Sequence, residues 1–233
     1  MQGRSVLVTG ATQGIGGAVA EILVAAGARV VIAARTESRL RSSAERLGCD
    51  WLAVDLATPA AVERTADRVR ARLGGAPDAV VSAAGAFALS DVERTSAEAL
   101  ERMLALNLRV PFDWIRCFLP EMKARGHGDL LHVGSVAGRR AFPGNAGYSA
   151  SKFGLRGLHE VLVAELAGTG VRSTLIEPAA VDTPLWDPID PDADPTLPSR
   201  GQMLQPADVA EAILFALTRP AHVCVPLIQI QRA

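Results

Sequence analysis

The sequence predicts an α/β protein, a doubly wound Rossmann fold in which helices cover both faces of a parallel sheet of about seven strands. Two observations predict it. Short β-branched runs alternate with longer, alanine-rich helical patterns along the chain. Each run is apolar on both faces, which is typical of parallel strands buried between helix layers. No linker or internal repeat interrupts the 233 residues, so we expect one domain over 1–233.

The expected elements follow one another as strand, helix, strand. The strands are expected at 6–8, 30–32, 51–54, 79–81, 130–133 and 173–176, with a seventh within 223–230 that Pro226 interrupts. The helices are expected at 14–26, 37–47, 59–73, 97–124, 147–167 and 206–218. Strands joined through helices in this way form right-handed crossovers in one sheet.

One segment breaks this alternation. Residues 184–198 contain five prolines with four aspartates between them, a composition that suits neither a helix nor a central strand. A long loop inside a compact domain often has a functional role. We therefore expect a substrate lid over 184–205, with a substrate pocket between residues 136–147 and this segment. Phe142, Leu185 and Trp186 are expected as apolar walls.

Composition excludes several classes of protein. The chain has 24 Lys and Arg against 25 Asp and Glu, which argues against a nucleic-acid binder. It shows no secretory signal and no apolar stretch long enough to span a membrane. Its three cysteines, Cys49, Cys117 and Cys224, are far apart and fit no metal-ligand spacing. We expect a cytoplasmic protein with reduced thiols and no bound metal.

The first strand ends in a glycine-rich turn, Gly10-x-x-x-Gly14-x-Gly16. Glycine lets the backbone turn sharply and approach a ligand closely. The helix that follows directs its free N–H groups and its positive dipole end toward the same place. This spacing differs from the G-x-G-x-x-G fingerprint but uses the same device. The turn predicts a site for the pyrophosphate of a dinucleotide.

The end of the second strand indicates which dinucleotide. Folds that prefer NAD place an acidic residue there for the ribose 2′-hydroxyl, whereas folds that prefer NADP supply arginine. Here Ala34 carries no charge, and Arg35 and Thr36 follow it. Arg35 suits a phosphate, although a solvated arginine is the alternative. Glu37 is a candidate ribose ligand but is expected to begin the next helix.

Tyr148 and Lys152 form a candidate catalytic pair. Tyr148 is the only tyrosine, and Lys152 lies four residues later, on the same face of the expected helix 147–167. A phenol titrates near pH ~10, and a nearby ammonium group lowers that value toward the range useful for acid–base catalysis. Ser135 closes the fifth strand, where its hydroxyl can hold a substrate oxygen.

In these motifs the chain resembles the short-chain dehydrogenase/reductase family, in its compact single-domain branch. The resemblance covers almost the whole chain. It rests on Thr9-Gly10-x-x-x-Gly14-Ile15-Gly16, Ser135, Tyr148-x-x-x-Lys152, and Asn107 within Leu106-Asn107-Leu108. In this order and spacing the combination of motifs is highly specific.

The resemblance implies a role for each of these residues. Tyr148 would be the general acid/base, Ser135 would position the carbonyl, and Lys152 would bind the nicotinamide ribose. Asn107 would kink its helix and hold a water in a proton relay. Asp55 matches a position beside the adenine ring. The full set of implied cofactor contacts is Gly10, Thr12, Gln13, Gly14, Ile15, Gly16, Arg35, Thr36, Asp55, Leu56, Ala84, Gly85, Tyr148, Lys152, Pro178, Val181 and Thr183.

Three departures from the family pattern stand out. After the fourth strand the family often carries Asn-Asn-Ala-Gly, whereas this chain has Ser82-Ala83-Ala84-Gly85, so we expect weaker local bracing. Pro-Gly after the sixth strand is replaced by Pro178-Ala179, which is expected to restrict the backbone. The C-terminal segment lacks the Gly-Gly ending common in 3-oxoacyl-carrier-protein reductases.

The expected function is an NADP(H)-dependent oxidoreductase that interconverts a small ketone or aldehyde and an alcohol, with Tyr148 supplying the proton. The alternatives are an NADP(H)-binding sensor without turnover and a 3-oxoacyl-carrier-protein reductase. An epimerase or dehydratase is disfavoured, because that branch resembles longer chains. Apolar residues on the helices 97–124 and 147–167 extend beyond one stripe, which predicts a homotetramer or homodimer.

Overall fold

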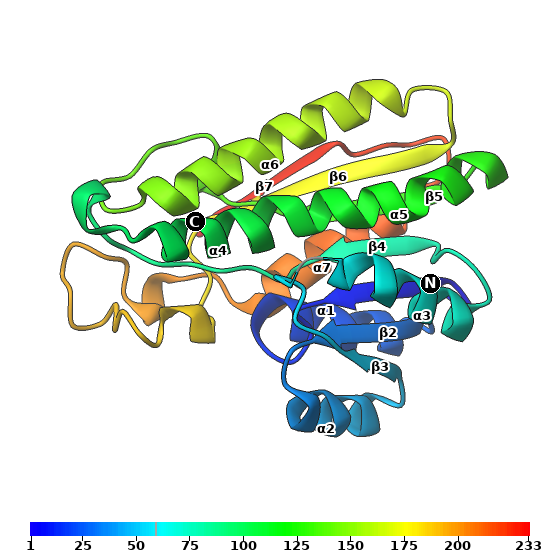
Figure 1. The fold of residues 1–233 in the computed structure, drawn as a ribbon, viewed down its shortest axis with the longest axis horizontal. Helices are drawn as coiled ribbons and strands as arrows, with labels where there is room; N and C mark the ends of the chain where they lie inside the picture. The colour runs from blue at the N-terminus through cyan, green and yellow to red at the C-terminus, as the bar shows by residue number, and fades with distance from the viewer. Residues whose placement is uncertain (59) are drawn as a thin grey trace.

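The computed structural model describes residues 1–58 and 60–233, and it confirms the predicted doubly wound sheet (Figure 1). Seven parallel strands occur in the order β3-β2-β1-β4-β5-β6-β7. Their bounds are β1 Ser5–Thr9, β2 Arg29–Ala34, β3 Asp50–Ala53, β4 Ala79–Ser82, β5 Gly128–Val133, β6 Val171–Pro178 and β7 Leu227–Ile230. The seventh strand begins directly after Pro226, because proline cannot donate a ladder hydrogen bond.

The strand order reverses between β1 and β4, which lie side by side with Val6 opposite Ala79 and Thr9 opposite Ser82. The chain leaves β1 toward β2 on one side and leaves β4 toward β5 on the other. The connections after these two strands therefore diverge and leave a crevice at the carboxyl edge of the sheet. Ligands bind in such crevices in open α/β sheets.

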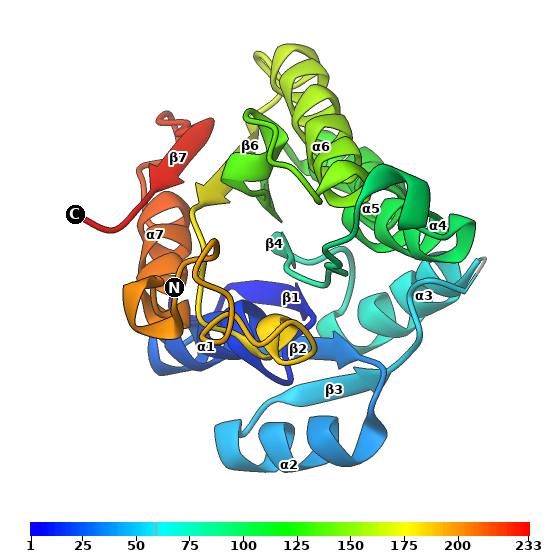
Figure 2. The same cartoon turned by 90° about the vertical axis from the view of Figure 1, so that its left-hand side faces the viewer.

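The described residues form seven α-helices in two layers, which Figure 2 shows on either side of the sheet. Helices α1, α2 and α7 cover one face, and α3, α4, α5 and α6 cover the other. Their bounds are α1 Gly14–Ala25, α2 Glu37–Leu47, α3 Ala61–Leu73, α4 Ala97–Leu104, α5 Val110–Arg125, α6 Ala146–Glu165 and α7 Pro206–Leu217. The expected helix 59–73 starts at Ala61, and position 59 lies outside the described residues.

The expected single helix 97–124 is in fact two α-helices. A π-helical turn, η2 (Ala105–Arg109), separates α4 from α5. Pro111 stands in the first turn of α5, where its missing N–H is tolerated. The π-helical turn contains Asn107, so the helix changes its winding at a residue predicted to kink it. Such turns occur frequently at functional sites.

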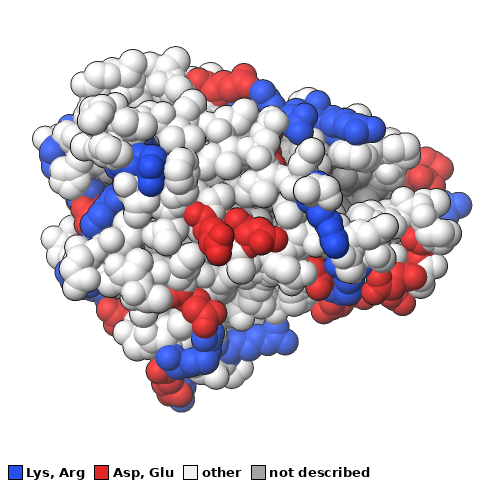
Figure 3. All heavy atoms as spheres, turned by 180° about the vertical axis from the view of Figure 1, so that it is seen from behind, with Lys and Arg blue, Asp and Glu red and all other residues white. Residues whose placement is uncertain are grey.

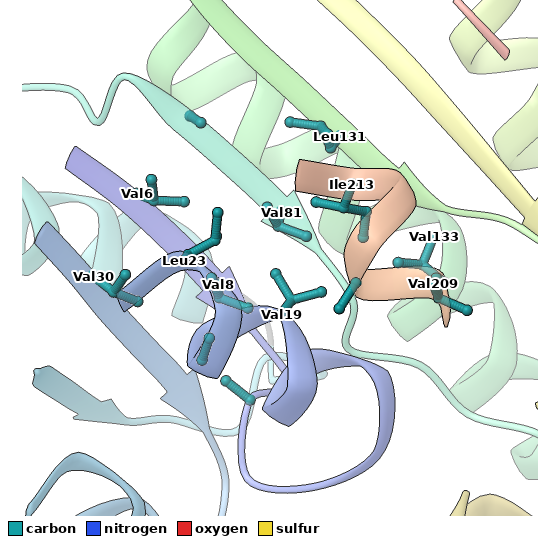
Figure 4. Close-up of a cluster of buried hydrophobic side chains, with 14 of the residues drawn as sticks. Val6, Val8, Val19, Leu23, Val30, Val81, Leu131, Val133, Val209 and Ile213 are labelled. Carbon is teal, nitrogen blue, oxygen red and sulfur yellow. The ribbon is translucent and has the colours of Figure 1, made fainter. Parts of the chain in front are cut away.

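A separate hydrophobic core fills each side of the sheet. Figure 4 shows the first, where Val19 and Leu23 of α1 and Val209 and Ile213 of α7 meet valines of the central strands. In the second core, Trp114 and Phe118 of α5 stack with ring centroids 5.6 Å apart and are fully buried. Burying apolar area of this kind is the main favourable contribution to folding. The cores hold the strand ends, and hence the loops at the carboxyl edge, in fixed positions.

The surface carries charges of both signs. On the face shown in Figure 3, blue Lys and Arg side chains alternate with red Asp and Glu side chains. This mixture agrees with the formal net charge of -1. Among the residues that the structure describes, every helix is too short or too polar to cross a membrane.

Candidate active site

A cavity of about 660 Å³ lies at the carboxyl edge of the sheet, in the crevice at the strand reversal. Loops after β1, β2, β4, β5 and β6 all contribute to its walls. It brings together every site residue predicted from the sequence except Asp55. Asp55 is exposed and accepts a hydrogen bond from the Ala57 N–H at 3.1 Å. Its neighbours Val54 and Leu56 border the cavity in its place.

The turn after β1 requires glycine at two positions, Gly10 and Gly16. Gly10 has φ +70°, and a Cβ there would lie 2.8 Å from the backbone of Ala84. A Cβ on Gly16 would lie 2.5 Å from the Gly10 carbonyl oxygen. Gln13, the N-cap of α1, makes no side-chain capping bond, which leaves the first-turn N–H groups free for an anion. This turn, residues 10–16, is here called the glycine cradle. Its free N–H groups fit the pyrophosphate of a dinucleotide.

Gly10→Ala is expected to destabilise the fold by about 2–4 kcal/mol, because it combines left-handed backbone strain with overpacking against the loop after β4. Gly48→Ala is the matched control. Gly48 has a similar φ of +67°, but a Cβ there would meet nothing within 4 Å. Urea unfolding of both variants measures the difference. Equal losses of unfolding free energy in the two would contradict the close approach of Gly10 to Ala84.

Two guanidinium groups border the end of the cavity near β2. Arg35 follows the strand, and Arg39 lies in the first turn of α2, where its Nη1 donates to Gln13 Oε1 at 2.8 Å. Arg39 is a site residue that the sequence motifs do not indicate. Its signal is nevertheless present, since Arg35 and Arg39 are four residues apart around the start of a helix. Glu37 begins α2, as expected.

The catalytic candidates meet at the other end of the cavity. Tyr148 and Lys152 lie in the first two turns of α6, and the Lys152 Nζ is 5.5 Å from the centre of the Tyr148 ring. Lys152 Nζ donates to the Val133 carbonyl at 2.8 Å. Ser135 follows two residues later, and its Oγ accepts from the Ala137 N–H at 3.1 Å. One cluster in space therefore contains Ser135, Tyr148 and Lys152.

Burial controls the protonation of this pair. It raises the pKa of Tyr148 to about 12, and the hydrogen bond with Ser135 lowers it only in part. Burial also lowers the pKa of Lys152 to about 8. The expected lowering of the Tyr148 pKa by the ammonium group does not occur in the free protein, because desolvation of the phenolate is the larger effect. The phenol stays protonated at neutral pH, as a proton donor must.

Asn107 is buried within the π-helical turn and fully bonded. Its Oδ1 accepts from the Ala86 N–H, and its Nδ2 donates to the Ala86 carbonyl and to Ser151 Oγ, each at 2.9 Å. Ser151 in turn donates to the Tyr148 carbonyl at 2.7 Å. Asn107 thus fixes the loop after β4 to the start of α6. Ser151, which belongs to no motif of the sequence, is the link between them.

The loop after β4 is braced despite its missing asparagines. Thr9 Oγ1 accepts from the N–H groups of Ala83 and Ala84 at 3.2 and 3.1 Å. The weaker bracing expected for this segment is therefore offset by a hydroxyl from β1. Ala179, which replaces the family's glycine, has an ordinary backbone conformation and donates to the Ile230 carbonyl at 2.8 Å.

Aromatic side chains form a wall beside Tyr148. The Phe87 ring packs edge-on against Tyr148 and against Trp186, with centroids 4.9 Å apart in both pairs. Trp186, Leu185 and Phe142 border the cavity, as the sequence predicts. Phe87 is a further wall residue that the sequence does not indicate, because no motif surrounds it. The wall makes this end of the cavity apolar.

The expected lid lies across the same end of the cavity and is the gold-to-orange segment at the left of Figure 1. It contains two short 3-10 turns, η4 (Pro184–Trp186) and η5 (Arg200–Gln202). Arg200 donates to Asp182 at 2.6 Å and to Asp187 at 2.7 Å, which joins the two ends of the segment. Trp186 Nε1 donates to the Val181 carbonyl at 3.1 Å. These bonds hold Trp186 over the cavity.

The amino-acid sequence is similar to those of known proteins. The family model described as short chain dehydrogenase matches residues 4–194. An oxidoreductase of Staphylococcus saprophyticus is 34% identical over 231 residues, 97% of this chain and 95% of its own. A glycine betaine reductase of Emericella nidulans is 34% identical over 99% of this chain, which corresponds to 19% of that longer protein.

The fold is also similar to solved structures of short-chain oxidoreductases and dehydrogenases. The closed form of a serine dehydrogenase complexed with NADP⁺ has a TM-score of 0.89 at 31% identity and covers 97% of this chain and 93% of its own. A metagenomic short-chain oxidoreductase in complex with NADP has a TM-score of 0.85 at 27% identity, covering 100% and 98%. Fold and site together define a dinucleotide-dependent oxidoreductase. The chain belongs to the short-chain dehydrogenase/reductase family.

Proposed function

We propose that the protein is an NADP(H)-dependent reductase of small ketones or aldehydes, reversible as an alcohol dehydrogenase. The observation that carries the proposal is the cavity that joins the glycine cradle and two arginines to Ser135, Tyr148 and Lys152. The NADP complexes of two similar structures support the choice of cofactor. No group of three or more candidate metal ligands occurs among residues 1–58 and 60–233.

The residues divide the reaction between them. The nicotinamide, when bound, supplies the hydride. Ser135 holds the substrate oxygen, and Tyr148 donates its phenolic proton to that oxygen as the alcohol forms. With a pKa near 12, Tyr148 begins in the protonated state that reduction requires. Lys152 carries a positive charge below about pH 8, which favours the phenolate that proton donation leaves behind.

The test is a panel of ketones, aldehydes and alcohols assayed with both NADP(H) and NAD(H). We expect NADPH oxidation with at least one carbonyl compound. The competing interpretation is a sensor that binds NADP(H) without turnover, for which Tyr148 and Lys152 would have no use. A carrier-protein reductase would act on acyl chains and not on free small ketones. Tight NADPH binding with no turnover of any compound would favour the sensor.

Preference for NADP(H) over NAD(H) rests on Arg35 and Arg39. Charge-assisted hydrogen bonds to a 2′-phosphate contribute ~1.5–3 kcal/mol, which corresponds to roughly 10- to 150-fold in affinity. Arg35→Ala is expected to raise KM for NADPH by about that factor and to change KM for NADH little. Arg39→Ala should act in the same direction, since Gln13 holds its side chain at the cavity.

Arg41→Ala is the matched control for these variants. Arg41 lies on the same helix and pairs with the exposed Glu37 at 3.4 Å, but it does not border the cavity. We expect no change in cofactor preference when it is replaced. Equal kcat/KM values for NADPH and NADH in the wild-type enzyme would contradict the assignment of both arginines.

We also propose that the protein forms a homodimer or homotetramer. Among the apolar residues expected to form an extra face, Met103, Leu106, Leu155 and Leu162 are buried within the chain. The apolar side chains left exposed on α5 and α6 are Phe112, Phe153 and Val161. Sedimentation at micromolar concentration is expected to show an oligomer that Val161→Glu weakens, whereas Val92→Glu, on an exposed turn elsewhere, leaves it intact. A wild-type monomer would contradict the proposal.

Two further assignments belong to the same proposal. Segment 184–205 acts as a lid, and the ion pairs of Arg200 with Asp182 and Asp187 hold it closed.

A cytoplasmic location is supported by three free thiols at Cys49, Cys117 and Cys224. Reduced cysteines are typical of that compartment.

A further inference from the structure

Glu177 places a fully buried carboxylate near the end of β6. Its side chain is 0% exposed. Its Oε1 accepts from Arg156 Nη1 of α6 at 3.2 Å, and its Oε2 accepts from Gln229 Nε2 of β7 at 3.1 Å. Arg139 Nε forms an ion pair with the same Oε2 at 3.3 Å. A buried charge needs such partners, so Glu177 joins α6, β7 and the segment around Arg139 at one point.

Arg139 belongs to the same short segment as Ser135. The chain leaves β5 and winds from Ser135 into a single 3-10 turn, η3 (Val136–Gly138), which Arg139 closes as the C-cap. The Gly138 N–H donates to the Ser135 carbonyl at 2.9 Å. The Arg139 N–H donates to the Val136 carbonyl at 3.1 Å. Because these bonds close one tight turn, a displacement of Arg139 also displaces the backbone of Ser135.

The η3 turn has few other polar links to the rest of the fold. Within residues 136–140, all of which the structure describes, Arg139 is the one side chain with an ion pair or a hydrogen bond to another element. The backbone of the turn packs closely on α6, since a Cβ on Gly138 would lie 2.8 Å from the Lys152 carbonyl oxygen. A small movement of η3 therefore changes its position relative to the helix that carries Tyr148.

We propose that Arg139, held by Glu177, is a positioning residue for Ser135. The buried carboxylate fixes the guanidinium group, and the guanidinium group fixes the end of η3. The turn in turn holds the Ser135 hydroxyl beside Tyr148. Neither Arg139 nor Glu177 borders the cavity, so both act through Ser135 and not on the substrate. The inference rests on the proposed reductase function, in which Ser135 holds the substrate oxygen.

Arg139→Ala is expected to lower kcat for carbonyl reduction by about 10- to 10²-fold, because a displacement of about 1 Å at a reacting group has effects of this size. KM for NADPH should stay within about twofold, since the turn is remote from the glycine cradle and from Arg35. Steady-state kinetics with NADPH and a carbonyl compound of the assay panel measures both constants. A loss confined to KM for NADPH would contradict the positioning role.

Arg156→Ala is the matched control. Arg156 pairs with the same carboxylate at 3.2 Å against 3.3 Å for Arg139, and the two side chains are 30% and 38% exposed. It lies on the long helix α6, which the buried Leu155 and Leu162 hold in place, and not in η3. Both variants should lose similar unfolding free energy, but kcat of Arg156→Ala should stay within about twofold of the wild type. An equal fall of kcat in both variants would assign the effect to general destabilisation.

A double-mutant cycle with Ser135→Ala tests whether Arg139 acts through Ser135. Once the Ser135 hydroxyl is absent, Arg139→Ala should lower kcat no further, because the group that it positions is gone. Losses that multiply in the double variant would overturn the proposal. Arg139→Lys keeps a positive charge beside Glu177 and is expected to recover most of the kcat that Arg139→Ala loses. A rate as low as that of Arg139→Ala would count against the ion pair.

Amide hydrogen exchange, followed by NMR, reports the same positioning without turnover. The Ala137 N–H donates to Ser135 Oγ at 3.1 Å, and the Gly138 N–H donates to the Ser135 carbonyl. Both amides are expected to exchange about tenfold faster in Arg139→Ala, comparable to the loss of one interaction with a charged group, and at an unchanged rate in Arg156→Ala. Unchanged exchange in Arg139→Ala would overturn the positioning role, even in an active reductase. Faster exchange in that variant, with no reduction of any carbonyl compound by the wild type, would support the positioning of Ser135 and count against the reductase.

Discussion

The Tyr148→Phe enzyme is expected to reduce carbonyl compounds about 10²–10⁴-fold more slowly than the wild type, the range typical of general acid catalysis by one side chain. The change removes the phenolic O–H, whose proton we assign to the substrate oxygen held by Ser135. The ring and its edge-on contact with Phe87 remain, so the cavity keeps its shape. Affinity for NADPH should stay nearly unchanged.

Stopped-flow measurement of NADPH oxidation at saturating substrate gives the loss in kcat, and fluorescence titration gives the Kd for NADPH. A fall in kcat at constant Kd is the signature of a group used only in the transition state. If the variant turns over at a rate near that of the wild type, Tyr148 is not the proton donor. An increase in the Kd for NADPH comparable to the loss in kcat would instead indicate a binding role.

Lys152→Ala is expected to impair both catalysis and cofactor binding, with kcat/KM for NADPH reduced by about 10²-fold or more. The resemblance to the family assigns the ammonium to the ribose hydroxyls, and each charge-assisted bond contributes ~1.5–3 kcal/mol. The same change leaves the phenolate formed at Tyr148 without its nearest positive charge. It also removes the donor to the Val133 carbonyl.

The pH dependence identifies Lys152 separately from these losses. The pKa of Lys152 is about 8 and that of Tyr148 about 12 in the free protein. Since Lys152 loses its charge as the pH rises through 8, kcat/KM for NADPH in the wild type should decline above that pH. The Lys152→Ala enzyme should lack this decline. A profile with the same decline in the variant would assign it to another group.

The fold was predictable because its signals are local and repeated. Valine-rich runs buried on both faces define the strands, and the structure places β1 and β4 side by side as the doubly wound topology requires. The division of 97–124 was harder to foresee. Leucine and alanine around Asn107 fit an α-helix as well as a π-helical turn, and no spacing in the sequence encodes the three hydrogen bonds that the Asn107 side chain makes to Ala86 and Ser151.

The candidate site was predictable where spacing encodes geometry, as for the glycine cradle and the pair Tyr148 and Lys152. It was not predictable where side chains reach the cavity from loops without a motif. Phe87 and Asn145 border the cavity only because the loop after β4 passes beside the start of α6. The raised pKa of Tyr148 could not be predicted from the sequence either, because the burial that raises it depends on the whole cavity wall.

A single-turnover experiment decides whether this site reduces a carbonyl group with a proton from Tyr148. Wild-type enzyme is mixed with one equivalent of NADPH and an excess of a carbonyl compound from the assay panel, and NADPH loss and formation of the alcohol product are quantified together. We predict one alcohol formed for each NADPH oxidised, and almost none over the same time with Tyr148→Phe. NADPH that is bound tightly but not consumed, in this mixture and with every other carbonyl compound, would contradict the proposed reductase.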